Sequence, residues 1–473
     1  MRPFFKPLSM LRIPSFSKDQ QVDKSLRHSI KDGIAFSVMT GSAESYFSAF
    51  AIFLKASTPQ VALLASLPPL LASFSQLAAV YLGQKTGARK EVVVAGAIIQ
   101  LLALVCVAVF PVLFHDHSFV LLLGFVVLYF VGPNLGAPLW GSLMGAIVPE
   151  NVRGRFFGAR TRLSSVASFS SLIIAGLVLQ FFDSLALTYY GFACIYGLGV
   201  VARGVSAWHL SQLHDPPHVN SLPGDVSNLF NKGFFRGQSG FLRFSVFYAC
   251  MQGAVAISGP LVVVYLLRVL EFSYIELTIN TAASVLVQFL VLSRWGRLSD
   301  LFGNRIILRL TGFMIPLVPL LWILSADFYY LLFVQAISGL LWSGFSLSAS
   351  NSVYDMTGQN KRAGLMAVHA LLAASSVFVG AILGGWLTVH LPTEVTLFGR
   401  SFSWLTSIYC VFVISTLFRL IVAFAFLPRL PEVRDVRAMT YHGLFFRVTR
   451  FSPISGVIFE AVSRRKKSDG EDL

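Results

Sequence analysis

Long apolar runs separated by short polar turns are the feature that most constrains this chain. Of its 473 residues, 55% are hydrophobic and only 12% are charged, about half the charged fraction of a typical soluble domain. A helix that crosses a bilayer needs about 20 apolar residues. By that rule we expect an all-α integral membrane protein with twelve transmembrane helices, at residues 33–55, 60–83, 91–113, 118–147, 157–182, 188–210, 241–268, 274–295, 304–324, 328–354, 363–389 and 402–427.

A polar connector divides these runs into two sets of six. It contains Pro216, Pro217, Pro223 and Gly224, residue types that interrupt helices. The predicted organisation is a cytoplasmic N-terminal tail (1–32), a first six-helix half (33–210), a cytoplasmic connector (211–240), a second six-helix half (241–427) and a basic cytoplasmic tail (428–473). The last segment mixes aromatic and basic residues, and both an interfacial segment on anionic lipid and a disordered tail remain open for it.

The basic residues indicate how the chain is oriented. With the N-terminus inside, all of the 37 Lys and Arg fall in cytoplasmic segments or at their edges except Lys55, Arg268, Arg400 and Arg419. This is the distribution expected when cytoplasmic loops carry the positive charge, so both termini are predicted to be cytoplasmic. The chain lacks Asn-x-Ser/Thr sequons, which favours the bacterial inner membrane.

The sequence lacks the patterns typical of nucleic-acid binding, metal binding and ATP-driven transport. The net charge is +15, but the basic residues lie in short loops without an aromatic groove, so nucleic acid is not an expected partner. All four cysteines lie in apolar runs, which predicts neither a disulfide nor a metal site. A phosphate-binding GxxxxGK[ST] loop is absent from the sequence, so ATP-driven transport is not expected.

One polar turn carries a recognisable motif. It reads Gly296-Arg297-Leu298-Ser299-Asp300-Leu301-Phe302-Gly303-Asn304-Arg305. Its glycines would allow a tight reversal, and Asp300 would cap the following helix. A degenerate copy, with Gln84 in the place of Asp300, runs from Leu82 to Arg89 at a constant offset. This turn resembles the signature loop of the major facilitator superfamily, although Leu301 stands where that family usually has a basic residue.

The resemblance covers nearly the whole membrane region and implies a function. It implies two parallel six-helix repeats, each with this turn between its second and third helices. It also implies a monomeric secondary transporter, without a cofactor and not an enzyme, that moves a small solute through the bilayer by alternating access. The fifth predicted helix lacks the Gly-Pro of drug exporters, which favours solute uptake or exchange. A non-transporting sensor or lipid-handling member of the same fold is the alternative, because a fold does not fix a function.

The resemblance also implies a cytoplasmic gate. Basic turns after the fourth and tenth helices would face the signature loops of the opposite half, so that Asp300 would lie close to Arg153 or Arg155. The candidate gate residues are Gly87, Arg89, Arg153, Arg155, Gly296, Asp300, Gly303, Arg305 and Arg362. The alternative is that these charges only fix the topology.

Glu44 is the sharpest single candidate for transport chemistry. It lies near the middle of the first predicted helix, where an ionised carboxylate is costly unless it faces the bundle interior. Helical spacing places Ser37, Thr40 and Glu44 on one face. Glu44 is therefore a candidate for proton coupling or substrate binding, and a structural carboxylate bonded to a neighbouring helix is the alternative.

In the family, helices 1, 4, 7 and 10 line the central cavity. The polar and aromatic candidates on the last three are Asn134, Trp140, Tyr248, Gln252, Trp342, Ser348 and Asn351. The eighth helix adds a stripe of Asn280, Ser284 and Gln288, and the eleventh adds His369. Helix-to-helix bonding is the alternative role for each residue. Arg160, Arg203 and Arg419 are expected to extend toward the headgroups.

Overall fold

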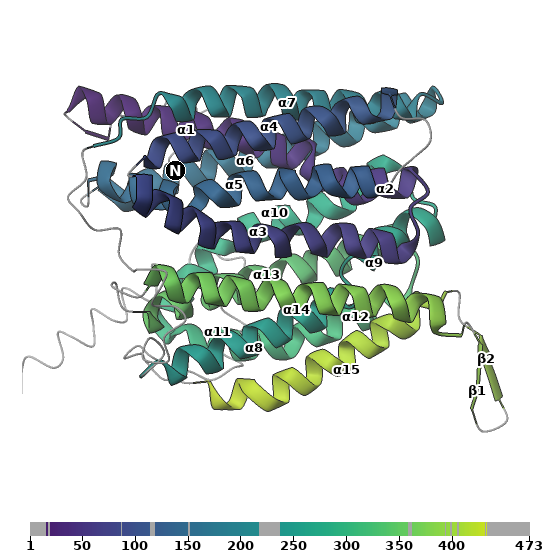
Figure 1. The fold of residues 1–473 in the computed structure, drawn as a ribbon. Coiled ribbons are helices and arrows are strands. Elements are labelled where there is room, and N and C mark those ends of the chain that lie inside the picture. Colours follow the sequence, from purple (N-terminus) through teal and green to yellow (C-terminus); the bar gives the residue numbers. More distant parts are fainter. Residues whose placement is uncertain are drawn as a thin grey trace, which may run out of the picture.

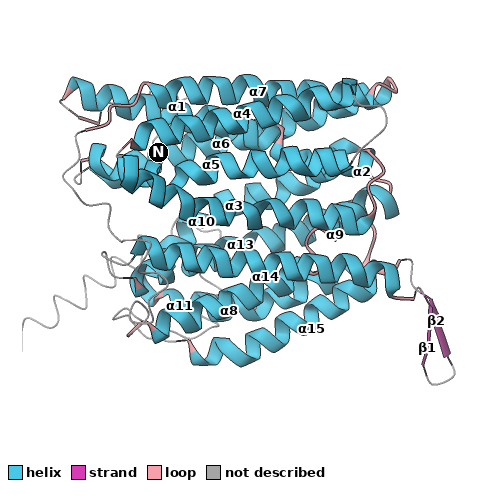
Figure 2. Ribbon diagram, in the orientation of Figure 1, coloured by secondary structure: helices cyan, strands magenta, loops and turns pink. Residues whose placement is uncertain are grey.

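The computed structural model describes residues 16–17, 19–86, 88–113, 119–149, 152–216, 237–357, 362–392, 394–397, 400–403, 406–430 and 432, with the backbone alone at 77, 80–86, 110–113, 362–363, 394–397 and 400–403. The helices run alongside one another as two layered bundles (Figure 1). A two-stranded hairpin at one end is the exception to the helical architecture of the described residues (Figure 2).

The N-terminal half contains the first seven α-helices. These are α1 (Gln20–Ser42), α2 (Phe47–Phe53), α3 (Thr58–Thr86), α4 (Arg89–Leu113), α5 (Phe119–Ile147), α6 (Arg153–Ser184) and α7 (Thr188–Ser211). A short 3₁₀ turn, Glu44–Tyr46, joins α1 to α2.

The C-terminal half contains the remaining elements. These are α8 (Ser239–Ala256), α9 (Leu261–Val264), a π turn (Tyr265–Val269), α10 (Tyr274–Phe302), α11 (Asn304–Met314), a 3₁₀ turn (Ile315–Leu317), α12 (Val318–Leu324), α13 (Phe328–Met356), α14 (Arg362–His390), β1 (Glu394–Leu397), β2 (Arg400–Ser403), α15 (Ile408–Phe426) and a final turn (Leu427–Arg429). The strands are antiparallel, with Glu394 opposite Ser403.

Ten helical segments of the described residues are long and apolar enough to cross a membrane. The α1–α2 segment and α3 are helical as expected but are not among those ten. The prediction of a helical membrane protein is therefore confirmed, whereas the count of twelve spans stays a prediction for these two segments.

Several helix boundaries differ from those expected. The first helix begins at Gln20, not at residue 33, because Asp19 accepts the Gln21 and Val22 N–H groups as an N-cap. The seventh and ninth expected helices are each broken near a proline, at Pro260 and Pro316, which cannot donate a backbone hydrogen bond. The last helix begins at Ile408, because the hairpin occupies part of the expected range.

The two ends of the bundle differ in charge. One end, here called the basic end, holds the turns before α4, α6 and α11, with Arg89, Arg153 and Arg305 among its residues. The other, the hairpin end, holds β1 and β2 and the starts of α3, α10 and α13 (Figure 1).

The halves meet mainly along two helix pairs. In the first pair α3 packs against α14, and in the second α6 packs against α10. At Gly176 of α6 an added Cβ would lie 2.2 Å from Thr278 Oγ1 of α10, so only glycine allows this approach. The second pair therefore fixes α6 and α10 close together nearer the hairpin end.

Candidate functional site

Glu44 lies where the first helical segment changes its winding. The α-helix ends at Ser42, and Glu44 opens the 3₁₀ turn before α2. Its Oε2 accepts a hydrogen bond from the Tyr129 hydroxyl at 3.0 Å. Tyr129 is fully buried on α5. Thr40 and Ser37 are half-buried one and two turns earlier, and the Thr40 hydroxyl donates to the Ser37 carbonyl at 3.1 Å.

Because of this change in winding, the residues expected to share a helical face with Glu44 do not do so. The spacing of an α-helix holds only to Ser42, because a 3₁₀ turn has about three residues per turn. Ser37 and Thr40 therefore do not share one regular helical stripe with Glu44. Tyr129 was not singled out from the sequence, since nothing local relates two residues that are 85 positions apart.

A buried acid–arginine network lies closer to the basic end in the same half. Asp32 of α1 is 4% exposed, and its Oδ2 lies 3.3 Å from Arg160 Nη2 of α6. The Ser206 hydroxyl donates to Asp32 Oδ1 at 2.7 Å, and Arg203 Nη1 donates to Ser206 Oγ at 2.6 Å. The Asp32 carboxylate on α1 thus connects Arg160 on α6 with Arg203 on α7, the latter through Ser206.

The arginines of this network are not extended toward the headgroups as expected. Arg203 is 3% exposed, and its guanidinium lies over the Phe36 ring at 5.1 Å. Arg160 lies over the Trp140 ring at 4.5 Å and donates from Nε to the Ser29 carbonyl. The expectation was wrong because α1 begins earlier than assumed, which brings Asp32 inside the bundle.

Arg419 also departs from its expected position. It is 4% exposed on α15 and donates to Ser258 Oγ at 2.7 Å. It also donates to the carbonyls of Val255 and Ile315. The Ile315 carbonyl has no α-helical partner, because Pro319 has no N–H, and it accepts from the Val318 N–H in the 3₁₀ turn. Arg419 therefore adds hydrogen bonds to polar groups at the helix breaks of the C-terminal half.

The C-terminal half presents an aromatic and neutral polar cluster on α8, α13 and α14. The ring of Tyr248 lies 4.8 Å from that of His369 and is stacked on Phe345 at 6.2 Å. Gln252 Nε2 donates to the Tyr248 hydroxyl at 2.7 Å, and His369 Nδ1 lies 3.0 Å from Ser245 Oγ. The predicted candidates Tyr248 and Gln252 are thus brought together.

The other predicted cavity residues are more dispersed. Asn134 accepts from Gln76 Nε2 of α3 at 2.5 Å, which ties α5 to its neighbour. Trp140 covers Arg160, and Trp342 packs edge-on against Phe345. Ser348 is fully buried, and its hydroxyl has no hydrogen-bond partner among the described residues.

The signature turn is built differently from the expected reversal. Gly296 lies inside α10, and Asp300 is exposed in the last turn of that helix. The N-cap of α11 is Gly303, not Asp300. Gly303 has φ +84°, a conformation that favours glycine. The expectation placed the turn too early, because α10 continues to Phe302.

Polar side chains fasten this turn to the end of α13. Ser299 Oγ donates to Asn304 Oδ1 at 2.6 Å, and Asn304 Nδ2 donates to Asp355 Oδ2 at 3.1 Å. Asn351, expected in the cavity, donates to Ser299 Oγ at 3.2 Å. The Arg305 backbone N–H donates to Glu432 at 2.9 Å. Asn351 therefore joins the turn to α13 at the basic end.

The corresponding turn of the N-terminal half uses an ion pair. Arg89 Nη2 lies 2.6 Å from Asp215 Oδ1, and its Nη1 donates to Ser142. Arg89 is thus tied to the start of the connector within its own half. Arg153 and Arg155 are exposed near the start of α6. Gly87 lies outside the described residues, as does the side chain of Arg362.

Hydrogen bonds join the two halves near the hairpin end. They link Tyr46 to Thr278 (2.8 Å), Gln180 to the Ile275 N–H (3.3 Å), and Arg268 to the Ala56 carbonyl. Tyr46 also donates to the Leu172 carbonyl at 2.8 Å. The halves are therefore fastened to each other at this end.

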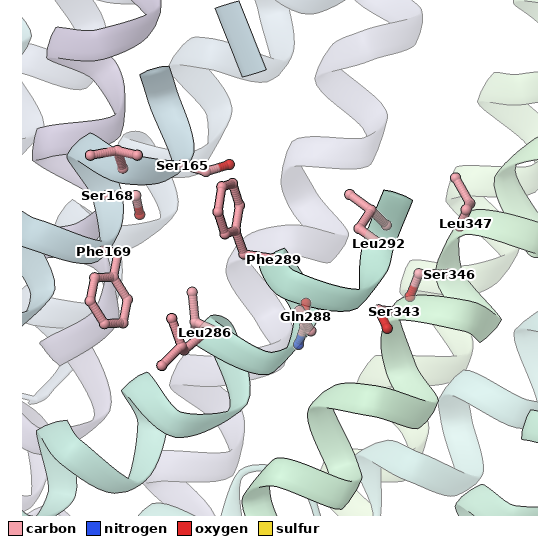
Figure 3. A pocket seen from close by; sticks show the side chains of 12 residues that line it. Ser165, Ser168, Phe169, Leu286, Gln288, Phe289, Leu292, Ser343, Ser346 and Leu347 are labelled. Atoms are coloured by element: carbon pink, nitrogen blue, oxygen red, sulfur yellow. The ribbon is translucent and has the colours of Figure 1, made fainter. Parts of the chain in front are cut away.

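A cavity of about 440 Å³ lies between the halves at mid-helix depth. Its walls come from α6, α10 and α13 (Figure 3), and its lining residues are Ser165, Val166, Ser168, Phe169, Val285, Leu286, Gln288, Phe289, Leu292, Ser343, Ser346 and Leu347. The size falls within the roughly 300–1,000 Å³ of small-molecule sites. Gln288, from the polar stripe predicted on the eighth helix, is among these residues, whereas the candidates on the first, fourth, seventh and tenth predicted helices are not.

The sequence matches the family described as the Major Facilitator Superfamily over residues 33–275 and 244–459. These matches cover most of the chain and fall on its two halves. The chain therefore belongs to the Major Facilitator Superfamily, as its signature turn indicated. No curated protein matches the sequence.

Solved structures share this fold at low sequence identity. The nucleoside transporter NupG is 13% identical, with a TM-score of 0.62 over 86% of this chain and 98% of that one. A bacterial homologue of the human lysosomal transporter Spinster, in an inward-facing and unoccupied conformation, is 16% identical, with a TM-score of 0.61 over 92% and 100%. A D-xylose–proton symporter is 12% identical, with a TM-score of 0.63 over 88% and 99%.

Proposed function

We propose that this transporter moves a small solute by alternating access and couples that movement to protons through Glu44. The observation that carries the coupling is the hydrogen bond between Glu44 and the buried Tyr129 at a break in the first helical segment. Alternating access rests on the two-half architecture, with a cavity between the halves at mid-depth. Substrate sites of such transporters lie near the bilayer midplane, between the repeats.

The chemistry of Glu44 suits a proton carrier. Its described partner is a neutral hydroxyl, and no ion pair to Glu44 is present among the described residues. A carboxylate at this depth is costly when ionised and much cheaper when neutral. Movement of the halves that changes its access to water would therefore change its proton affinity. Protonation and conformation would then be linked.

The present conformation is assigned as open toward the cytoplasm. If the basic end faces the cytoplasm, the bonds from Tyr46 to Thr278 and from Gln180 to Ile275 lie on the outer side. These bonds would have to break when the outer side opens. The similarity to a Spinster homologue described as inward-facing is consistent with this assignment.

We further propose the cytoplasmic gate expected from the sequence. In the opposite conformation Asp300 would approach Arg153 or Arg155 and hold the basic end closed. A carboxylate gains from a guanidinium and from the positive end of a helix, and both arginines lie in the first turn of α6.

The proposal also includes orientation and assembly. The chain would be a monomer in the bacterial inner membrane with both termini in the cytoplasm. Alkaline phosphatase, which is active only outside the cytoplasm, provides the test. We expect activity when it is inserted into the loop between β1 and β2 and none when it is inserted at residues 217–236. The reverse result would contradict the assigned orientation.

Proton coupling is tested with purified protein in proteoliposomes that contain a pH-sensitive dye. Sugars, organic acids, amino acids and cationic drugs are added to wild type, Glu44→Gln and Tyr129→Phe. Glu276→Gln is the matched control, because Glu276 caps α10 near the hairpin end and glutamine can replace glutamate in a capping box. We expect solute-driven proton movement in wild type and in the control, but not in Glu44→Gln.

Two outcomes would contradict the proposal in different ways. Solute flux without proton movement in wild type would refute the coupling while leaving a transporter. If no solute of the panel moved, the non-transporting sensor or lipid-handling alternative would be favoured. Tyr129→Phe is expected to shift the pH dependence of transport, because it removes the hydrogen bond to Glu44.

A further inference from the structure

A polar ladder connects α10 to α13. At its first step Gln335 Nε2 donates to Asn280 Oδ1 at 3.0 Å. One turn further along each helix, Gly339 packs directly against the Ser284 backbone, where an added Cβ would lie 2.4 Å from the Ser284 carbonyl oxygen. Four residues on, the two helices reach the cavity. The stripe of polar residues on the eighth predicted helix therefore leads to the cavity.

The polar side of the cavity is formed where this ladder ends. Gln288 and Ser343 both line the cavity (Figure 3). The Gln288 amide makes one long hydrogen bond, 3.5 Å to Ser284 Oγ, which is at the limit for such a bond. Ser343 donates its proton to the Leu340 carbonyl at 2.9 Å, so its oxygen is left to accept. An amide and a hydroxyl are thus available to a ligand.

The remaining walls determine which ligands fit. They are apolar or carry only hydroxyl groups, and Phe169 and Phe289 supply aromatic surface from α6 and α10. No Asp, Glu, Lys, Arg or His is among the lining residues described. The cavity is partly open, since Val166, Leu286 and Phe289 are each 43–52% exposed. A charged ligand would still give up hydration against the apolar walls and find no opposite charge there, which is unfavourable. The lining therefore selects against ions.

We propose that this cavity is the solute site, and that the solute is an uncharged amphipathic molecule with an apolar ring or carbon frame and hydroxyl or carbonyl groups. The frame lies against Phe169 and Phe289, and the polar groups bond to Gln288 and Ser343. The site is formed by both halves, because α6 belongs to one and α10 and α13 to the other. The inference rests on the proposed transport function.

Binding is tested with full-length protein in lipid nanodiscs, because alkyl maltoside detergents themselves belong to the proposed ligand class. The probes are matched pairs that differ in charge: phenyl glucoside and phenyl glucuronide, indole-3-ethanol and indole-3-acetate, 2-phenylethanol and 2-phenylethylamine. Glucose tests a polar frame without an apolar part. We expect saturable calorimetric binding confined to uncharged amphipathic members.

Variants locate the binding. Gln288→Leu should raise the dissociation constant of a bound probe about tenfold, the effect of losing one hydrogen bond to the half-buried Gln288 amide. Ser346→Trp should abolish binding by filling the cavity. Gln212→Leu is the matched control, since Gln212 is exposed at the end of α7. The thermal unfolding midpoint of each ligand-free variant shows whether it is folded.

Three results of these binding experiments would overturn the proposal. Equal or tighter binding of the charged members, no binding by any uncharged member, or unchanged binding in folded Gln288→Leu and Ser346→Trp would overturn it. Flux measurements in proteoliposomes separate the two claims. Binding that depends on these cavity residues but is not accompanied by flux would support the binding site and refute transport. Flux that is unaffected by both variants would support transport and refute this cavity as the solute site.

Discussion

Replacing Asp32 with asparagine should destabilise the protein by about 3 kcal/mol. The substitution preserves shape but removes the charge that lies 3.3 Å from Arg160 Nη2 and accepts from Ser206 at 2.7 Å. Removing one partner of a buried pair costs about 3–5 kcal/mol. The Arg160 side chain is 21% exposed and stays partly hydrated, which places the estimate at the lower limit. Arg203 is 3% exposed, so water does not hydrate its charge when the Asp32 charge is removed.

The assay is equilibrium unfolding in mixed SDS–lipid micelles. Arg160→Gln and the double variant complete a cycle, and we expect a coupling free energy of about 1–2 kcal/mol between the two residues. Asp327→Asn is the matched control. Asp327 is an exposed N-cap of α13, where asparagine serves equally well, so its unfolding free energy should match wild type. An Asp32→Asn protein as stable as this control would refute the reasoning.

Three further predictions concern the interface and the basic end. Gly176→Ala should reduce transport at least tenfold, because the new methyl group would overlap Thr278 Oγ1 and force α6 and α10 apart. The control Gly197→Ala, with open space around it, should transport as wild type does. Equal transport rates in the two variants would contradict the close approach of α6 and α10. Asn304→Ala should lower the unfolding free energy by about 1–3 kcal/mol, since it leaves a buried network short of a partner; an unchanged value in the same micelle assay would exclude that role. Asp300→Asn should slow flux severalfold without weakening solute binding if Asp300 closes the gate, and unchanged flux would show that its charge only fixes topology.

The fold followed from the sequence because its evidence is local. Apolar runs of bilayer length and one turn motif predicted the helical bundle and the family, and both are confirmed. Gly303 was correctly placed at the turn, where its positive φ requires glycine. Helix boundaries were less accurate, because a cap such as Asp19 or a break near Pro316 depends on bonds the sequence does not display.

The partners within the site could not be predicted for a different reason. Tyr129 and Glu44, or Asp32 and Ser206, meet only after helices far apart in the chain have packed. Asn351 illustrates the converse. Its place on the tenth predicted helix suggested a cavity role, yet the rotation of α13 turns it toward Ser299. A sequence indicates that an intramembrane polar residue needs a partner, but not which one.

The two halves differ in the chemistry of their interiors, which bears on how coupling would work. Two described carboxylates belong to the N-terminal interior: Asp32 lies on α1, near Arg203 of α7, and Glu44 lies in the 3₁₀ turn that follows α1. The cavity, by contrast, is lined by neutral side chains: its amide, Gln288, comes from the C-terminal half, and its hydroxyls come from both halves. Under the proposals made here, the proton and the solute would not compete for one group. Their coupling would pass through α6, which contacts α1 on one side and lines the cavity on the other.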